Sequence, residues 1–123
     1  MQIIELEEIY DLSSDVLNLQ STQDFAFCQT VVLGDGVNVD FDCRGRPVAI
    51  ELINPFKLLN LRRDILEDSR FDISLEVSSS IRLQMGAVTK NSLIEPRLLD
   101  VEVSNDFKIP SGRFAFKIAR MEI

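Results

Sequence analysis

Apolar and polar side chains alternate through residues 28–53, and two glycine-containing bends interrupt the alternation. A period of two is typical of a β-strand with one buried face. Asp35-Gly36 separates the first two runs, and Asp-Gly is a strong hairpin signal because both residues tolerate a positive φ. Arg44-Gly45 separates the second and third runs. The pattern predicts a meander of antiparallel strands, preceded by a short strand at 16–19.

The two bends also predict how the strands pair. A two-residue loop at Asp35-Gly36 places Val32 opposite Val39, Thr30 opposite Phe41, and Cys28 opposite Cys43. The second turn pairs Phe41 with Val48, Val39 with Ile50, and Val37 with Leu52. A slip of one residue would turn every side chain to the other face. A three-residue loop at Gly34-Asp35-Gly36 would undo the cysteine pairing. The expected buried face is Val32, Val37, Val39, Phe41, Val48, Ile50 and Leu52, and the expected outer face is Asn38, Asp40, Asp42 and Glu51.

A helix is expected after the meander. Asn54 can accept hydrogen bonds from free backbone donors, and Pro55 at the first helical position loses no hydrogen bond. The helix is expected to run to about Asp68. Its apolar residues cover more than one stripe of the helix surface, so we expect it to contact both halves of the chain.

The second half of the chain alternates again from Ile73 to Met85, as one long strand or as two joined at Ser79. Residues 99–103 and 114–118 alternate too, with a turn at Pro110-Ser111-Gly112 between them. We expect an α+β, β-rich fold: an antiparallel meander, one helix, and a second antiparallel layer sharing the core. With 123 residues, the chain fits a single domain 1–123, divided into a meander (1–53), a helix (54–69) and a C-terminal layer (70–123).

The negative charge is concentrated at one end of the sequence. Nine of the 20 acidic residues precede Arg44, the first basic residue, and the whole chain has a net charge of −7. Such a segment either keeps the protein soluble or binds a basic partner. Nucleic acid is not an expected direct partner, because its phosphates would be repelled and no basic stripe offsets that.

Targeting and cysteine content indicate the compartment. The sequence shows no signal peptide and no stretch long enough to span a membrane. Cys28 and Cys43 are too few for a disulfide framework and too far apart for a CxxC zinc motif. We therefore expect a cytoplasmic protein without a cofactor or a structural metal.

Three segments together resemble the YuzE-like family of domains of unknown function, over about residues 7–53. They are YDLSSDVLNL (10–19), VLGDGVNVDFD (32–42) and GRPVAIEL (45–52). Ala49 stands where a glycine is common in that family, and about seventy residues follow the matched part. The resemblance implies a small α+β module with no established activity. Some relatives look like antitoxin-type partners of small toxins, which implies that role as a possibility here.

Catalytic and metal-binding motifs are weak. Asp40, Asp42, Gly45 and Glu51 imitate the spacing of an EF-hand loop, but the flanks alternate as strands and Arg44 occupies a ligand position. The chain has no histidine, which excludes Ser-His and Cys-His nucleophile pairs. Paired acids on an exposed face lack the burial that raises a catalytic pKa. We therefore do not expect an enzyme.

Three functions follow as hypotheses. The first is a protein-binding or assembly module in which four acids of the sheet, Asp35, Asp40, Asp42 and Glu51, meet a basic protein, for example as an antitoxin-like partner. The second is a structural homo-oligomer formed through exposed strand edges or the apolar helix. The third is a metal-assisted hydrolase that uses Asp40, Asp42 and Glu51.

Overall fold

Nine β-strands and one short helix make up the described part of the chain. The computed structural model describes residues 1–11, 13–34, 36–59, 70–88 and 98–120. The elements are β1 (Gln2–Asp11), β2 (Val16–Ser21), β3 (Phe27–Gly34), β4 (Val37–Asp42), β5 (Pro47–Ile53), α1 (Pro55–Leu59), β6 (Arg70–Val77), β7 (Ser80–Val88), β8 (Leu99–Ser104) and β9 (Gly112–Arg120).

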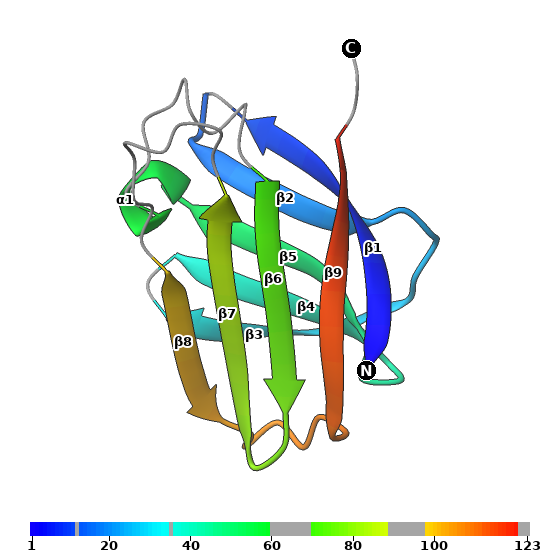
Figure 1. The fold of residues 1–123 in the computed structure, drawn as a ribbon. Helices are drawn as coiled ribbons and strands as arrows, with labels where there is room; N and C mark the ends of the chain where they lie inside the picture. The colour runs from blue at the N-terminus through cyan, green and yellow to red at the C-terminus, as the bar shows by residue number, and fades with distance from the viewer. Residues whose placement is uncertain (12, 35, 60–69, 89–97, 121–123) are drawn as a thin grey trace.

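All nine strands belong to one sheet in the order β3-β4-β5-β2-β1-β9-β6-β7-β8. Figure 1 shows strands β6 to β9 crossing in front of β2 to β5, so the sheet curls into a nearly closed barrel. Its two ends approach each other, because a Cβ on Gly34 of β3 would lie 3.6 Å from Cγ1 of Val101 in β8. The expected α+β fold with a second antiparallel layer is therefore wrong.

One strand pairing explains this correction. β9 lies between β1 and β6, parallel to β1 and antiparallel to β6. Its ladder with β1 runs from Gln2 opposite Phe114 to Glu8 opposite Arg120. β9 joins the two halves of the chain edge to edge. The two layers that the alternation predicted are therefore parts of one continuous sheet.

The pairing of β4 with β5 largely confirms the predicted register. Val37 lies opposite Leu52 and Val39 opposite Ile50. Both bend glycines, Gly36 and Gly45, have a φ of +81°, a conformation that glycine adopts without steric cost. An irregularity after Asp40 then places Phe41 opposite Pro47, where Val48 was predicted.

The predicted pairing of β3 with β4 is wrong by one residue. Val31 lies opposite Val39, and Thr30 lies opposite Asp40. A register shift between Val32 and Gly34 causes the slip, and a second shift between Phe27 and Gln29 moves the pairing by one further residue. A β-bulge adds one residue to one strand only, and every side chain beyond it changes face. Val32, predicted to be buried, is therefore 62% exposed, whereas Val31 is fully buried.

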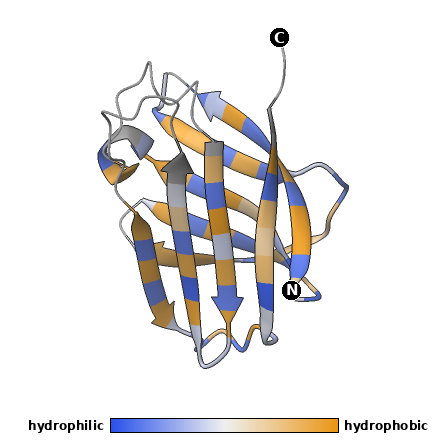
Figure 2. Ribbon diagram, viewed as in Figure 1, coloured by the Kyte–Doolittle hydropathy of each residue, from blue (hydrophilic) through white to orange (hydrophobic). Residues whose placement is uncertain are grey.

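Both halves of the sheet contribute to one core. Figure 2 shows hydrophobic and hydrophilic residues alternating along the strands. The buried hydrophobic residues of both halves pack into one cluster. The largest fully buried side chains are Phe41, Leu6, Leu17, Leu19, Ile50, Leu52, Leu59, Ile73, Leu75, Ile81, Leu83 and Met85. The alternation predicted from Ile73 to Met85 is confirmed as a hairpin of β6 and β7 that turns at Ser78–Ser79.

The helix begins where the sequence predicted. α1 starts at Pro55, and the backbone N–H groups of Lys57 and Leu58 donate to the carbonyl oxygen of Asn54. Leu59 is fully buried and anchors the helix to the core. The predicted end near Asp68 lies outside the described residues.

Neighbouring valines test the observed register of β3. Val31→Ala is expected to lower the free energy of unfolding by about 2 kcal/mol, because it removes two buried methyl groups and leaves a cavity. Val32→Ala is expected to change it by less than about 0.5 kcal/mol, because that side chain faces solvent. Urea unfolding of both variants measures the difference. A larger loss for Val32→Ala would contradict the slipped register.

Among the described residues, no helix has the length and apolar character needed to cross a membrane.

Candidate functional site

The four acids predicted to form a binding face do not stay together. Asp40 and Glu51 point outward from β4 and β5 and are partly exposed. Asp42 is buried, with 6% of its surface exposed, and Asp35 lies outside the described residues. Two of the four residues therefore share the outer face that the alternation predicted.

Amide and acidic side chains cover the outer face of the first half of the sheet. Asn38 lies opposite Glu51, which lies opposite Asn18 on the next strand. The Nδ2 of Asn38 donates to Oε1 of Glu51 at 3.1 Å, and the hydroxyl of Thr30 donates to Oδ1 of Asp40 at 2.6 Å. These contacts hold both carboxylates in place without neutralising either of them.

β1 and β2 extend this surface. Glu7 of β1 lies opposite Gln20 of β2, and Gln20 lies opposite Ala49 of β5, whose other neighbour is Asp40. We call Glu7, Asp40 and Glu51, together with the amides Asn18, Gln20 and Asn38, the acidic face. No ion pair within the described ranges involves Glu7, Asp40 or Glu51.

On the second half of the sheet, several surface acids lie next to an arginine. Arg82 of β7 donates from Nε and Nη2 to the two carboxylate oxygens of Asp100 at 2.9 and 2.7 Å. Glu102 lies 3.9 Å from Arg82, and Glu76 lies 3.8 Å from Arg113. The hydrogen bonds from Arg82 lower the pKa of Asp100. Glu76, Asp100 and Glu102 therefore each have a neighbouring arginine, whereas Asp40 and Glu51 have hydrogen bonds from uncharged groups only.

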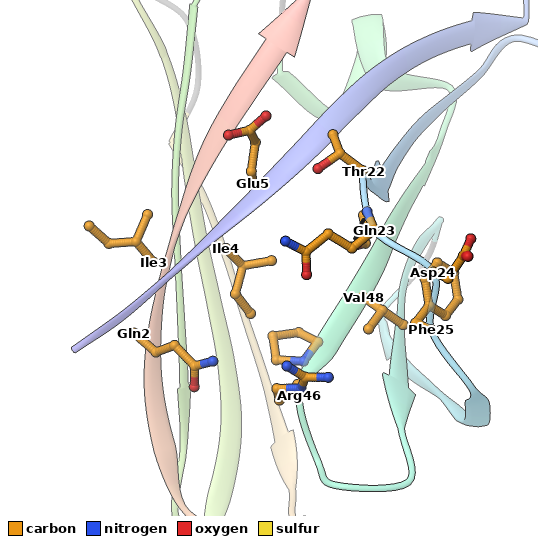
Figure 3. Close-up of a pocket in the computed structure, with 12 residues that line it drawn as sticks. Gln2, Ile3, Ile4, Glu5, Thr22, Gln23, Asp24, Phe25, Arg46 and Val48 are labelled. Atoms are coloured by element: carbon orange, nitrogen blue, oxygen red, sulfur yellow. Dashed lines mark hydrogen bonds between the residues drawn. The ribbon is translucent and has the colours of Figure 1, made fainter.

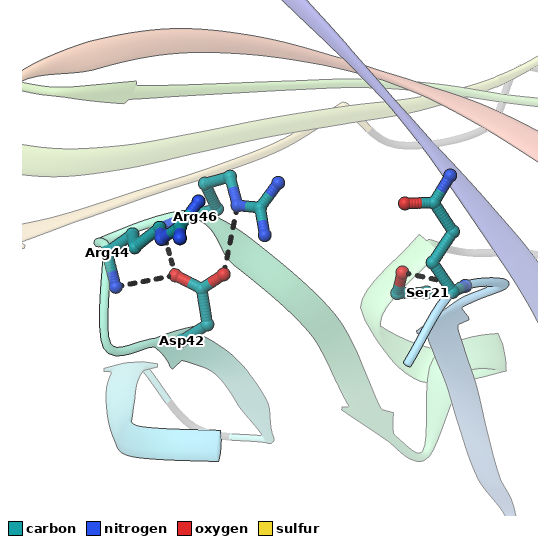
Figure 4. A network of polar contacts seen from close by, with 5 residues as sticks. Ser21, Asp42, Arg44 and Arg46 are labelled. Atoms are coloured by element: carbon teal, nitrogen blue, oxygen red, sulfur yellow. Dashed lines mark hydrogen bonds and ion pairs between the residues drawn. The ribbon is translucent and has the colours of Figure 1, made fainter. Parts of the chain in front are cut away.

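Asp42 organises the turn between β4 and β5. Its Oδ1 accepts hydrogen bonds from the backbone N–H groups of Arg44 and Arg46, and its Oδ2 accepts one from Nε of Arg46, each at 2.9 Å (Figure 4). Burial raises the pKa of Asp42, but these hydrogen bonds and the charge of Arg46 outweigh it, so the pKa is lowered overall. Asp42 is thus a structural residue of the turn, and its carboxylate is bound to Arg46.

The hydrogen bonds of Asp42 argue against the hypothesis of a metal-assisted hydrolase. That hypothesis needs Asp40, Asp42 and Glu51 to converge on one ion. The side chain of Asp42 instead points into the turn between β4 and β5, whereas the side chains of Asp40 and Glu51 face outward. In the part of the chain that the structure describes, no group of three His, Cys, Asp or Glu residues is placed to hold a metal.

Cys28 and Cys43 are both free and exposed. The bulge in β3 removes Cys28 from the ladder, because Phe27 is paired with Asp42 and Gln29 with Phe41. The predicted backbone register of the two cysteines is therefore wrong, but their side chains still lie within hydrogen-bonding contact. Hydrogen bonding with the Cys28 side chain raises the pKa of the Cys43 thiol, and burial and nearby negative charge add to that. A raised pKa reduces the thiolate fraction, so Cys43 is not an activated nucleophile.

A small cleft lies between the start of β1, the segment that connects β2 to β3, and the start of β5. Its volume is about 230 Å³. Figure 3 shows Ile4, Gln23 and Arg46 around this space, whereas Ile3 points to the other side of β1. Glu5 and Asp24 also line it. No local sequence pattern predicts this cleft, because its walls come from three segments that are distant in sequence.

Apolar side chains are exposed on the edge strand β3. Phe27 is 56% exposed and Val32 is 62% exposed, and Phe25 just before the strand is 38% exposed. Exposed apolar groups on an edge strand are a feature of surfaces that associate. The homo-oligomer stays a prediction.

Comparison of the chain with family models, with curated proteins and with solved structures finds no match. The resemblance to the YuzE-like family therefore stays a prediction.

Proposed function

We propose that this chain is a cytoplasmic protein-binding module whose acidic face receives a basic surface of another protein. The observation that carries the proposal is the contrast between the two halves of the sheet. The surface acids Glu76, Asp100 and Glu102 have arginines within 4 Å, whereas Asp40 contacts a hydroxyl and Glu51 contacts an amide.

The arrangement of the acidic face supports this use. Hydrogen bonds from Asn38 and Thr30 fix Glu51 and Asp40 before any partner arrives. Groups held in place in this way lose less side-chain entropy on binding. Uncompensated carboxylates also attract a basic partner over a distance and speed its encounter. An antitoxin-type role, implied by the YuzE-like resemblance, would be one form of such a module.

Two free thiols, Cys28 and Cys43, support the proposed compartment, because the cytoplasm keeps cysteines reduced.

A short oligolysine peptide is a suitable probe for the acidic face. We expect Asp40→Asn with Glu51→Gln to weaken its binding roughly five- to tenfold at low salt, because two unpaired charges are lost. Both substitutions keep an oxygen that can accept the hydrogen bond from Thr30 or Asn38. NMR titration, which follows the amide signals of β2, β4 and β5, measures affinity and location together.

The matched control is Glu76→Gln with Glu102→Gln, which changes the net charge by the same amount on the paired half of the sheet. This control is expected to bind the peptide nearly as well as the unmodified protein. Equal weakening by both pairs of substitutions, or binding that is insensitive to salt, would count against the proposal.

A further inference from the structure

Two turns far apart in sequence meet at one end of the barrel. The first is the turn between β4 and β5 that Asp42 organises. The second is the connection between β8 and β9. A Cβ on Gly45 would lie 2.6 Å from Cδ of Pro110, a distance at which only glycine fits. The two turns are therefore packed directly against each other.

Each turn is held rigid from within. Asp42 fixes the first through three hydrogen bonds to Arg44 and Arg46. Asn105 fixes the second, because its side chain donates to the carbonyl oxygen of Ile109 at 2.9 Å and accepts from the N–H of Ile109 at 3.0 Å. The same side chain donates to the carbonyl oxygen of Ser78 at 2.9 Å, which ties the connection to the β6–β7 hairpin. The backbone of both turns is therefore held in place before a ligand binds.

The contact of the turns forms a cleft of about 450 Å³ that three arginines line. Arg44 and Arg46 come from the first turn, and Arg113 comes from the start of β9. Among the described residues that line this cleft, none is an aspartate or a glutamate. A concentration of positive charge is unexpected in a protein with a net charge of −7.

The arginines keep donors available for a ligand. Arg46 uses Nε to bind Asp42, and Figure 4 shows its two terminal nitrogens directed away from that carboxylate. The side chain of Arg113 is 70% exposed, and its contact with Glu76 is a loose one at 3.8 Å. A planar guanidinium presents paired N–H donors that match the oxygens of phosphate.

We propose that this cleft binds the phosphate group of a small molecule, as free phosphate or as a phosphate monoester. The guanidinium groups of Arg44 and Arg113 can share the charge and the oxygens of one such dianion, and Arg46, which also lines the neighbouring 230 Å³ cleft, can add its terminal nitrogens. Ser111 adds a hydroxyl to the lining, and the ring of Phe114 and the side chain of Gln2 can contact an organic group. The acidic remainder of the protein repels a long polyanion, which favours a compact ligand over nucleic acid.

Titration of the full chain with inorganic phosphate and with phenyl phosphate, followed by NMR of the backbone amides, tests the proposal. We expect saturable shifts at Arg44, Gly45, Ser111 and Arg113. Tighter binding of phenyl phosphate would identify a phosphate monoester as the ligand, and equal affinity would identify free phosphate. Saturation that fails to appear below about 10 mM with either probe overturns the proposal, because that affinity is too weak for a built site.

Arg44→Gln with Arg113→Gln is expected to weaken phosphate binding at least about tenfold, because each arginine contributes charge-assisted hydrogen bonds. Both side chains are exposed, so these changes leave the core intact, and circular dichroism verifies the fold. Lys57→Gln with Lys117→Gln removes the same charge elsewhere and is the matched control. If this control weakens binding as much as the arginine changes do, the cleft is not the site.

Discussion

Phe41→Ala is expected to lower the free energy of unfolding by about 4 kcal/mol, the largest effect of any single change considered. Phe41 is fully buried in β4, and it is among the largest side chains in the core. Removing a buried phenyl ring costs about 3–5 kcal/mol, because the transfer free energy is lost and a cavity remains. Urea unfolding, followed by circular dichroism, measures the change.

Phe27→Ala is the control for this prediction. Phe27 belongs to the neighbouring strand β3, but 56% of its surface is exposed. Its replacement is expected to cost less than about 1 kcal/mol. Similar losses for the two phenylalanines would mean that Phe41 is not at the centre of the core.

Asp42→Ala is expected to lower the free energy of unfolding by about 3 kcal/mol. The change removes the acceptor for the N–H groups of Arg44 and Arg46 and for Nε of Arg46. Leaving donors without an acceptor in a partly buried turn costs more than the net value of the hydrogen bonds themselves. Asp40→Ala, which loses one hydrogen bond from Thr30 at the surface, is the control and is expected to cost under about 1 kcal/mol.

The loss should also depend on pH in a definite direction. The pKa of Asp42 is lowered in the folded state, so its contribution is complete above the unfolded pKa of about 3.9 and disappears as the pH falls through the lower folded pKa. Unfolding at pH 7 and at about pH 3 should therefore show the difference between Asp42→Ala and the unmodified protein shrinking on acidification. A difference that grows in acid would contradict the assigned role of Asp42.

Much of the local structure could be predicted from the sequence, because strand alternation and turn glycines are local signals. The bends at Gly36 and Gly45, the pairing of Val39 with Ile50, and the start of the helix at Pro55 all follow from neighbouring residues. The register of β3 could not be predicted with the same certainty. Residues 31–33 are all apolar, so alternation does not decide which of them face inward.

The long-range features left no local pattern. The ladder between β1 and β9 joins segments about a hundred residues apart, and nothing in either segment specifies the other. The candidate sites also combine features that a local pattern predicts with features that depend on long-range contacts. The outward positions of Asp40 and Glu51 follow from alternation, but Arg44, Arg46 and Arg113 come together only when the turns meet. The inward position of Asp42 comes after the irregularity in β4, which alternation does not reveal.

The placement of β9 has a consequence for how the molecule assembles. Without β9 the described strands would form two separate sheets, β3-β4-β5-β2-β1 and β6-β7-β8, each with one additional open edge. During synthesis the edge of β1 that pairs with β9 stays open until β9 leaves the ribosome. Contacts between the beginning and end of a chain raise the contact order and slow folding. Completion of the barrel is therefore expected to be late and cooperative, with β9 inserting between two preformed sheets.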